Sequence, residues 1–336
     1  MASNAAQSPV QTPKTKNTRL LIISDTHSQK LFPSTHSHHA FREPLPKADV
    51  LLHTGDLTMI GKLHEYEKTI EMLASIDAEL KLVIAGNHDI SLDEQFYKTD
   101  GKRMHRYDYD DMMPYKAKHM WKDQAKQKGI TYLEEGMHEF ELKSGVKFKV
   151  YASPYQPEFC DWAFPYEHDE DRFNPTSECL DGAKSIVQNP VPDFPEVDVM
   201  MTHGPPYRIL DQVVRGKEYV GCPHLLRAAY RAKPRLHCFG HIHEGWGARR
   251  ATWKEKAPKG TPKSVYDESV LTAEDVEVDP AKASREMAVY VDLSDSGPGP
   301  LKLGEETLMV NSSIMSVSFK PVQAPWLVDL ELPCPG

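Results

Sequence analysis

Residues 238–247, CFGHIHEGWG, place two histidines one residue apart, directly after a short apolar run. Side chains two positions apart in an extended segment point to the same side, so His241 and His243 can address one point in space. We expect Gly240 and Gly245 to let the backbone turn tightly there. Two neutral imidazoles aimed at one point are a common start for a metal site. An isolated pair is equally compatible with a hydrogen-bonded loop, so other residues must decide.

Four further apolar runs end in polar tips of the same character. The tips contain Asp, His or Asn and no Lys or Arg. Their candidate site residues are Asp25, His27, Asp56, Asn87, His88, Asp89 and His203. In open α/β sheets, ligands bind at the carboxyl ends of the strands, where such tips meet. So much carboxylate and imidazole in one crevice indicates bound cations, because buried charge must be paired or coordinated.

A count of the donor groups predicts two metal sites. Asp25, His27, Asp56 and one histidine of the 241/243 pair make the first site. Asp56, Asn87, His203 and the other histidine of the pair make the second. Asp56 serves both sites, since a carboxylate has two oxygens and can bridge. Mixed nitrogen and oxygen ligands suit manganese, iron, zinc or a similar divalent ion. Two such ions about 3.5–4 Å apart can clamp a displacement at phosphorus.

The composition is that of an ordinary globular protein with a negative charge. The chain has 336 residues, of which 40% are hydrophobic and 26% charged, and its net charge is −9. This charge argues against a nucleic acid or an anionic membrane as partner, but a small phosphoester substrate stays compatible because bound cations reverse the local field. Five cysteines without a CxxC motif argue against a disulfide framework. With no signal sequence and no apolar run of about 20 residues, we expect a cytoplasmic protein.

Apolar patterns predict the elements that position the polar tips. Buried runs indicate strands, apolar residues at helical spacing indicate helices, and their alternation is typical of βαβ units. The expected strands with polar tips lie at 19–24, 48–56, 81–89, 196–206 and 235–243, and the expected helices at 61–80, within 93–129 and at 222–232. Antiparallel strands are expected at 130–134, 137–143 and 146–152, and further strands at 288–293, 308–319 and 326–332.

Three segments fall outside this pattern. Residues 1–17 are polar and contain prolines, which predicts a disordered tail with order from Arg19 onward. Residues 253–286 are rich in Lys, Glu, Asp and Pro, which predicts a solvated insertion, with a lid as the alternative. The HSHH run at 36–39 lies in a polar loop and is interpreted as solvated. We expect the remaining chain, residues 18–332, to form a single domain.

The motifs SDTH, GD, GNHD, THGPP and GHIH resemble, in this order, those of the calcineurin-like metallophosphoesterases, over roughly residues 19–330. Further stretches resemble the metallophosphoesterase-domain-containing branch, which is similar to class III cyclic nucleotide phosphodiesterases. These stretches are YASPYQP, VGCPHLL, RLHCFGHIHEGWG, VNSS and PVQAPWLVDL. The resemblance implies an α/β fold, namely a four-layer αββα sandwich of two mixed β-sheets flanked by helices.

The resemblance also implies a role for each candidate residue. One divalent ion would be held by Asp25, His27, Asp56 and His243. The second would be held by Asp56, Asn87, His203 and His241. His88 would lie beside the ions and contact phosphate or protonate the leaving oxygen, with Asp89 orienting it or, as the alternative, only capping the next segment.

Three further residues are candidates for a supporting role around this site. Asn311, in VNSS, is expected to support the site through hydrogen bonds to the residues that hold the ligands, with ordinary strand-end hydrogen bonding as the alternative. Trp162 and Trp246 are candidates to wall a substrate pocket, since aromatic rings stack on bases, with core packing as the alternative.

Departures from the protein phosphatases of this superfamily bear on the substrate. Those enzymes follow GD with VDRG and place an Arg before NH, whereas this chain has GDLTMIG and AGNHD. The arginines that would grip a phosphoprotein are absent. A protein phosphatase is therefore disfavoured. The resemblance implies a phosphodiesterase for small diesters, with cyclic nucleotides as a candidate substrate, acting by attack of a metal-bridging hydroxide. The alternatives are a broad phosphomonoesterase and a non-catalytic scaffold, and formation of a homodimer stays open.

Overall fold

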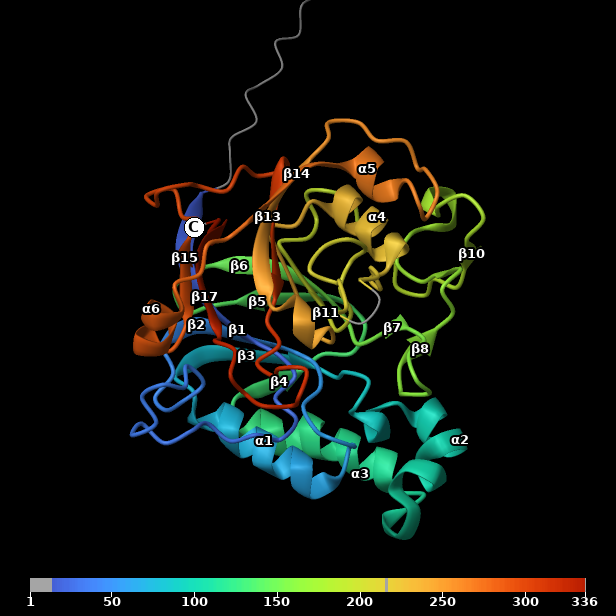
Figure 1. The fold of residues 1–336 in the computed structure, drawn as a ribbon, viewed down its shortest axis with the longest axis vertical. Coiled ribbons are helices and arrows are strands. Elements are labelled where there is room, and N and C mark those ends of the chain that lie inside the picture. Colours follow the sequence, from blue (N-terminus) through green and yellow to red (C-terminus); the bar gives the residue numbers. More distant parts are fainter. Residues whose placement is uncertain (1–13, 215–216, 336) are drawn as a thin grey trace, which may run out of the picture.

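The computed structural model describes residues 14–214 and 217–335 and contains two mixed β-sheets that lie face to face (Figure 1). The first sheet consists of β1 (Thr15–Ile23), β2 (Ala48–Thr54), β3 (Ala78–Ile84), β4 (Ile130–Tyr132), β15 (Val289–Asp292) and β17 (Trp326–Pro333). Its strand order is β15-β17-β1-β2-β3-β4. β1, β2, β3 and β4 run parallel, while β17 pairs with β1 in the antiparallel direction. The carboxyl ends of β1, β2 and β3 therefore meet at one edge.

The second sheet also has a parallel centre. Its strands are β5 (Gly136–Glu141), β6 (Lys147–Ser153), β11 (Val199–Thr202), β12 (Leu236–Phe239), β13 (Gly247–Trp253), β14 (Val270–Asp275) and β16 (Glu306–Asn311). They are arranged in the order β14-β13-β16-β12-β11-β6-β5. β6, β11, β12 and β16 are parallel, β5 and β13 are antiparallel to their neighbours in this centre, and β14 pairs antiparallel with β13. Short ribbons pair β7 (Gln156–Pro157) with β8 (Pro165–Tyr166) and β9 (Glu170–Asp171) with β10 (Lys184–Ser185).

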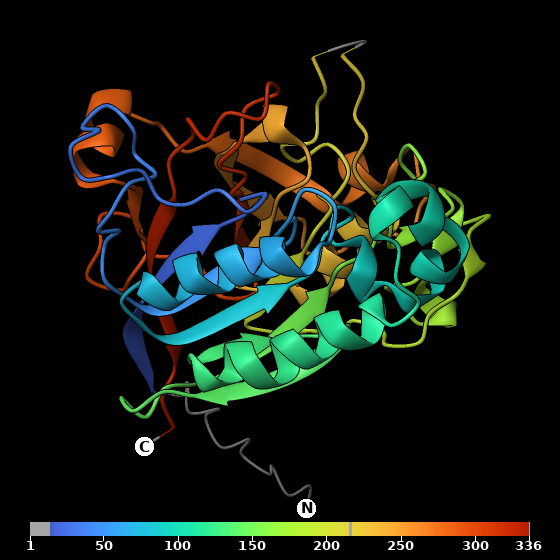
Figure 2. The same ribbon diagram turned by 90° about the horizontal axis from the view of Figure 1, so that it is seen from below.

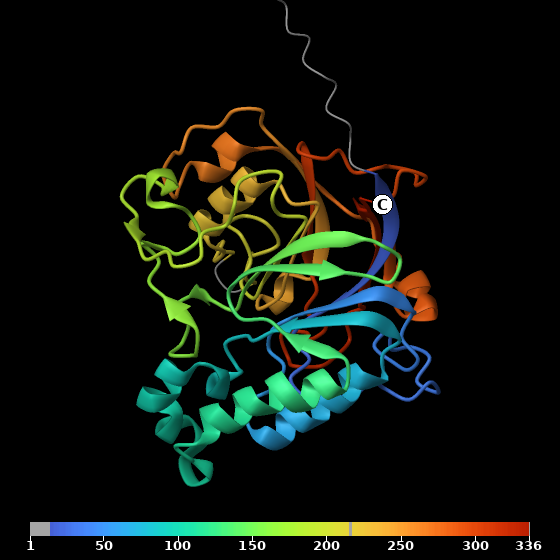
Figure 3. The same cartoon turned by 180° about the vertical axis from the view of Figure 1, so that it is seen from behind.

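Helices cover the outer face of each sheet. They are α1 (Leu63–Ser75), α2 (Glu94–His105), α3 (Met113–His119), α4 (Pro223–Ala232) and α5 (Val265–Ser269). A further helix, α6 (Pro280–Glu286), lies beside the edge strand β15 and places Ala283 in the core between the sheets. α1 and α3 lie across the first sheet, as the view from below shows (Figure 2). α4 and α5 lie on the far side of the second sheet (Figure 3). Across the described ranges, no helix is long and apolar enough to cross a membrane.

The alternation of side chains along each strand produces the four layers. In β1, Leu21 and Ile23 face the helix layer and pack in one core with Tyr66 of α1. Leu20 and Ile22 face the opposite way, into a second core between the two sheets. A third core lies between the second sheet and α4. The fold is therefore the four-layer αββα sandwich that the resemblance implied.

The expected disordered tail at 1–17 is wrong for its last residues. β1 begins at Thr15 rather than at Arg19, and residues 15–17 pair with residues 331–333 of β17. This part of β1 has exposed polar side chains and is held by backbone hydrogen bonds, so its composition resembles that of a tail. Residues 1–13, the rest of the expected tail, lie outside the described residues.

The expected solvated insertion at 253–286 is also wrong in part. It contains the edge strand β14, which pairs with β13, and α5, whose Val265 is buried against the α4 layer. Most side chains of β14 are exposed. The sequence of this edge strand therefore lacks the alternation of apolar and polar residues that predicts a strand. Two smaller differences concern β4, which is parallel to β3 rather than antiparallel, and α1, which ends at Ser75 rather than reaching residue 80.

The packing between the sheets leads to a test of stability. Leu20 is fully buried in the core between the sheets, whereas Leu271 of β14 is 62% exposed. Leu20→Ala leaves a cavity and is expected to lower the free energy of unfolding by about 2–5 kcal/mol. Leu271→Ala, the matched control, is expected to change it by less than about 0.5 kcal/mol. Urea unfolding measures both values, and similar losses for the two variants would contradict the layer assignment.

Candidate metal centre

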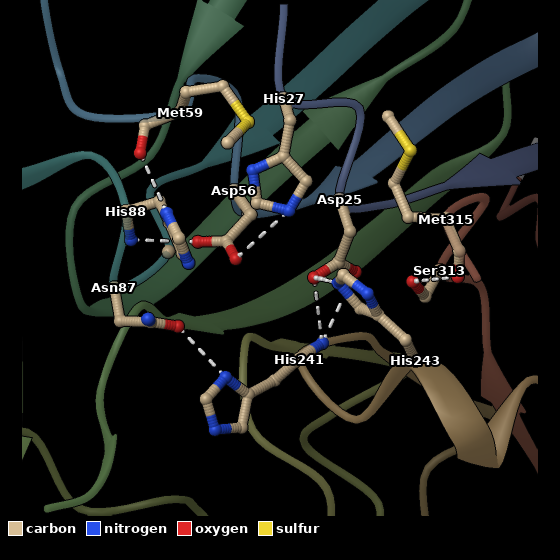
Figure 4. A network of polar contacts seen from close by, with 12 residues as sticks. Asp25, His27, Asp56, Met59, Asn87, His88, His241, His243, Ser313 and Met315 are labelled. Carbon is tan, nitrogen blue, oxygen red and sulfur yellow. Dashed lines mark hydrogen bonds and ion pairs between the residues drawn. The ribbon is translucent and has the colours of Figure 1, made fainter. Parts of the chain in front are cut away.

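The candidate ligands come together where parallel strands of both sheets end (Figure 4). Each candidate ligand lies just after the carboxyl end of a strand, and two of these strand ends carry two ligands each. Asp25 and His27 follow β1, Asp56 follows β2, Asn87 follows β3, His203 follows β11, and His241 and His243 follow β12. Residues that are more than 200 positions apart, such as Asp25 and His241, thereby come into hydrogen-bond contact.

The two carboxylate oxygens of Asp56 face different histidines. Oδ2 lies 3.7 Å from His27 Nε2, and Oδ1 lies 3.4 Å from His203 Nε2. Asp56 belongs to two groups whose ligand atoms lie within 4.8 Å of one another, one with His27 and His88 and one with Asp25 and His203, while Asp25, His27 and His243 form a third such group. Asp56 therefore lies between two groups of donors, as a bridging carboxylate would.

Backbone carbonyls orient the imidazoles. The Nδ1 atoms of His27, His203 and His243 donate to the carbonyls of Thr58, Thr54 and Ser316, at 2.9, 3.0 and 3.1 Å. Their Nε2 atoms consequently point into the centre, with a lone pair in the neutral ring. Such hydrogen bonds are the usual support of metal-binding histidines. The backbone carbonyls involved have no side-chain signal in the sequence, so sequence analysis did not identify them.

The donor set fits a divalent cation, because acceptor atoms face one another without a proton between them. His203 Nε2 lies 2.8 Å from Asn87 Oδ1, although its own proton is on Nδ1. His241 Nδ1 lies 2.8 Å from the same Asn87 oxygen and can donate to it in the Nδ1–H tautomer. His27 Nε2 is buried and has no hydrogen-bond partner among the residues described. A cation bound between these atoms would remove each conflict.

Burial sets the protonation of the histidines. It lowers the pKa of His27, His203 and His241, so these rings are neutral and able to coordinate. Burial also opposes a charge on His243, but the contact with Asp25, at 3.5 Å, raises its pKa. The neutral state is the form in which imidazole binds metal.

The two carboxylates of the centre differ in protonation. Burial would raise the pKa of Asp25, but the hydrogen bond with His243 and the nearby imidazoles hold it below its usual range. Burial, together with the charges of Asp25 and Asp89, raises the pKa of Asp56 well above the usual range. Two carboxylates this close cannot both ionise easily without a cation, which again fits a metal centre.

The glycines of the 238–247 loop serve close approach rather than the tight turn that we expected. Neither Gly240 nor Gly245 has a positive φ. A Cβ on Gly240 would collide with Asp25 Oδ2, and one on Gly245 would collide with the Leu210 carbonyl. The left-handed residue of this loop is His241, with φ of 66°. Glycine is therefore needed here for space beside the candidate ligands.

His88 is held beside this centre by its backbone and its ring. Its backbone N–H donates to Asp56 Oδ1 at 2.9 Å, and its Nδ1 donates to the Met59 carbonyl at 2.8 Å. The ring stacks on Trp162 with centroids 4.0 Å apart. Trp162 therefore lies beside the candidate centre, as the interpretation of this residue as a pocket wall predicts. Burial lowers the pKa of His88 to about 4, which makes the ring neutral. A ligand atom of His88 lies within 4.8 Å of ligand atoms of His27 and Asp56, so these three residues form another group that could hold a metal ion.

Asp89 stabilises the loops that follow β2 and β3 and does not orient the His88 ring. Its carboxylate accepts from the backbone of Leu57, Thr58 and Gly86 and from the Thr58 hydroxyl, at 2.7–3.0 Å. Burial raises the pKa of Asp89 to about 7. The expected orienting role therefore belongs to the Met59 carbonyl, because the ring of His88 donates there.

Asn311 supports the loop of the histidine pair from β16. Its Nδ2 donates to the Ile242 carbonyl, between His241 and His243, at 2.8 Å and to the Leu210 carbonyl at 3.3 Å. Trp246 packs on Trp326 in the core instead of approaching the candidate ligands.

Two aromatic residues that sequence analysis missed border the centre. The Phe319 ring is 46% exposed and lies 5.1 Å from the rings of His27 and His243. The Phe159 ring is 52% exposed and meets His241 edge-on at 5.5 Å. A cavity of about 660 Å³ begins beside His241. Both phenylalanines lie in loops outside the recognised motifs, so no pattern in the sequence marked them.

Comparison with known proteins agrees with this geometry. The profile of the family described as calcineurin-like phosphoesterase matches residues 18–245. Human metallophosphoesterase domain-containing protein 1 is 34% identical over 235 residues, which cover 68% of this chain and 62% of that protein. A UPF0046 protein of Caenorhabditis elegans is 31% identical over 247 residues, covering 71% of this chain and 69% of the relative. The chain thus spans less than two thirds of the human relative.

A likeness among solved structures is weaker. Phosphopantetheinyl hydrolase from Mycobacterium tuberculosis shares 15% identity, with a TM-score of 0.37, over 78% of this chain and 96% of that one. The family match at residues 18–245, in contrast, covers most of the chain and includes all the polar tips that form the candidate centre. On these matches, the chain belongs to the calcineurin-like phosphoesterase family.

Proposed function

We propose that this protein is a metal-dependent phosphodiesterase that hydrolyses small diesters. Family membership supports the reaction class, which is hydrolysis of a phosphoric ester. The observation that carries the choice of a diester is the charge around the centre. Within the described residues, no Lys or Arg side chain bonds to the candidate ligands. A monoester carries a second negative charge, which Arg or Lys commonly matches, whereas a diester carries only one.

The directions of the side chains support the ligand assignment that the family resemblance implies. One ion would be held by Asp25, His27, Asp56 and His243. The other would be held by Asp56, Asn87, His203 and His241. When bound, such a pair of ions lowers the pKa of a water molecule and offsets charge on the phosphate oxygens. Manganese, iron and zinc all suit these ligands.

The residues of the chain itself supply position and proton handling. The Met59 carbonyl holds the proton on His88 Nδ1, so Nε2 is the free nitrogen of the neutral ring. Nε2 can take up the proton that the attacking water releases and pass it on to the leaving oxygen, so the proton balance of the hydrolysis closes. The stacking of Trp162 and the hydrogen bond to Met59 fix the ring in one orientation. The cavity beside His241 has room for an organic group of nucleoside size, which keeps cyclic nucleotides among the candidate substrates.

Relative rates on two aryl esters test the choice of substrate class. Bis-p-nitrophenyl phosphate and p-nitrophenyl phosphate release the same leaving group, so their rates compare a diester directly with a monoester. We expect kcat/KM to be at least about tenfold higher for the diester, because no cationic side chain meets the second charge of the monoester. A higher value for the monoester would favour a phosphomonoesterase instead.

The bridging role of Asp56 can be tested without an activity assay. Chelator-treated protein is expected to gain about 2.7 kcal/mol of stability when Mn²⁺ is added at 100 times its Kd. Asp56→Asn keeps an acceptor for the His88 N–H but removes the bridging charge, so most of this gain should disappear. His36→Ala, in the exposed HSHH loop, should retain the full gain. An unchanged gain in Asp56→Asn, or fewer than two ions per chain in elemental analysis of wild type, would refute the assignment.

The role of His88 leads to a separate test. His88→Ala is expected to lower turnover of bis-p-nitrophenyl phosphate by about 10²–10⁴-fold while the metal content stays the same, because the ring handles protons. His64→Ala, an exposed histidine on α1, serves as the control and should keep wild-type turnover. If the His88 variant matched wild type, the proton-handling role would be wrong.

A further inference from the structure

The cavity beside His241 shares a wall with the candidate metal centre. It measures about 660 Å³, and His241 and Ile242 of the histidine loop form one side of it. Phe159, from the loop after β7, forms the border with the centre, since its ring meets the His241 ring edge-on at 5.5 Å. A group attached to phosphorus at the centre would reach this cavity directly.

Aromatic rings form the walls of the cavity. The rings of Tyr207 and Tyr219 stand nearly perpendicular, at 76°, with their centroids 6.3 Å apart, and so make a corner. Phe159 and Tyr219 are 52% and 44% exposed and line the same cavity, so their exposed surfaces are gathered in one place. Exposed aromatic surface of this kind marks a binding site, and ring faces attract cations.

The charged residues of the cavity favour a positive ligand. Its described lining includes the acidic residues Glu158, Glu218 and Glu244, against the single cationic residue Lys263. Arg208, which is not part of this lining, lies 5.5 Å from the centroid of the Tyr219 ring and is paired with Asp267. In the described parts of the chain, none of these three carboxylates forms an ion pair with a Lys or Arg. Their charge is therefore available to a ligand. A phosphate chain or a carboxylate entering this cavity would be repelled.

We propose that this cavity binds one alcohol arm of the phosphodiester and that this arm carries an ammonium group. The inference rests on the proposed function, since the phosphorus must be held at the metal centre. The substrate would then be a zwitterion, with its phosphate at the ions and its ammonium group between the aromatic rings and the carboxylates. Because His241 lies between the metal centre and the cavity, the phosphate and the ammonium group of the substrate must be far enough apart to reach past this residue.

Two matched esters test the charge of the arm. p-Nitrophenyl phosphorylcholine carries a trimethylammonium group, and p-nitrophenyl 3,3-dimethylbutyl phosphate carries an uncharged group of the same shape. Their leaving group is identical, so the ratio of their kcat/KM values reports the cavity alone. We expect a ratio of at least about five in favour of the choline ester at low salt, which falls as sodium chloride screens the carboxylates.

Variants locate the effect in the cavity. Glu158→Gln and Phe159→Leu should each lower the ratio by at least about twofold, since one removes a charge and the other an aromatic face. Glu71→Gln makes the same change of charge on the exposed face of α1 and should leave the ratio unchanged. A measurement independent of turnover uses choline chloride alone, which should raise the melting temperature, whereas 3,3-dimethylbutanol should not.

The outcomes separate this inference from the proposed function. Hydrolysis of both esters at equal rates, or faster hydrolysis of the neutral ester, would overturn the ammonium arm and leave the phosphodiesterase intact. The same holds if Glu71→Gln lowers the ratio as much as Glu158→Gln does. Failure to hydrolyse these two esters and bis-p-nitrophenyl phosphate in metal-loaded protein would overturn the proposed function, and the inference with it.

Discussion

The burial of several carboxylates and imidazoles in one cluster is the constraint on which the rest of this molecule depends. Asp25, Asp56 and His203 are nearly or fully buried, and none of them has a Lys or Arg partner among the described residues. Backbone strain adds to the cost, because Asp25 and Asp56 both have φ of 54°, in the left-handed region. Such a cluster persists only if the surrounding structure is rigid and strongly stabilised.

The two facing sheets supply that rigidity. The apolar core between them lies directly beneath the centre, since β1 contributes Leu20 and Ile22 to this core and then continues into Asp25. A parallel bridge between Ser24 and Ser313 joins the ends of the two sheets, and Asn311 holds the histidine loop through Ile242. Because each ligand-bearing loop is short and follows a buried strand, packing of the strands fixes the ligand positions.

The parts of this arrangement that are encoded in side-chain patterns could be predicted from the sequence. Buried runs ending in Asp25, Asp56 and His203 predicted both the strands and their meeting point. Contacts made by the backbone leave no such pattern, and the carbonyl of Met59, which orients His88, went unnoticed for that reason. The same physics explains β14 and the start of β1, where hydrogen-bonded edges carry polar, exposed side chains.

The sign of the charge changes over short distances on this protein, and this change determines how a charged substrate is oriented in the site. The chain as a whole is negative, at −9, which does not favour the approach of an anion. At physiological salt, however, fields fade over about 8 Å, so a substrate in the site responds mainly to its nearest groups. Bound ions would make the centre attractive to phosphate, while Glu158 and Glu244 keep the neighbouring cavity negative. A substrate with opposite charges at its two ends is then held in one orientation, whereas a dianion would be repelled from the cavity it must enter.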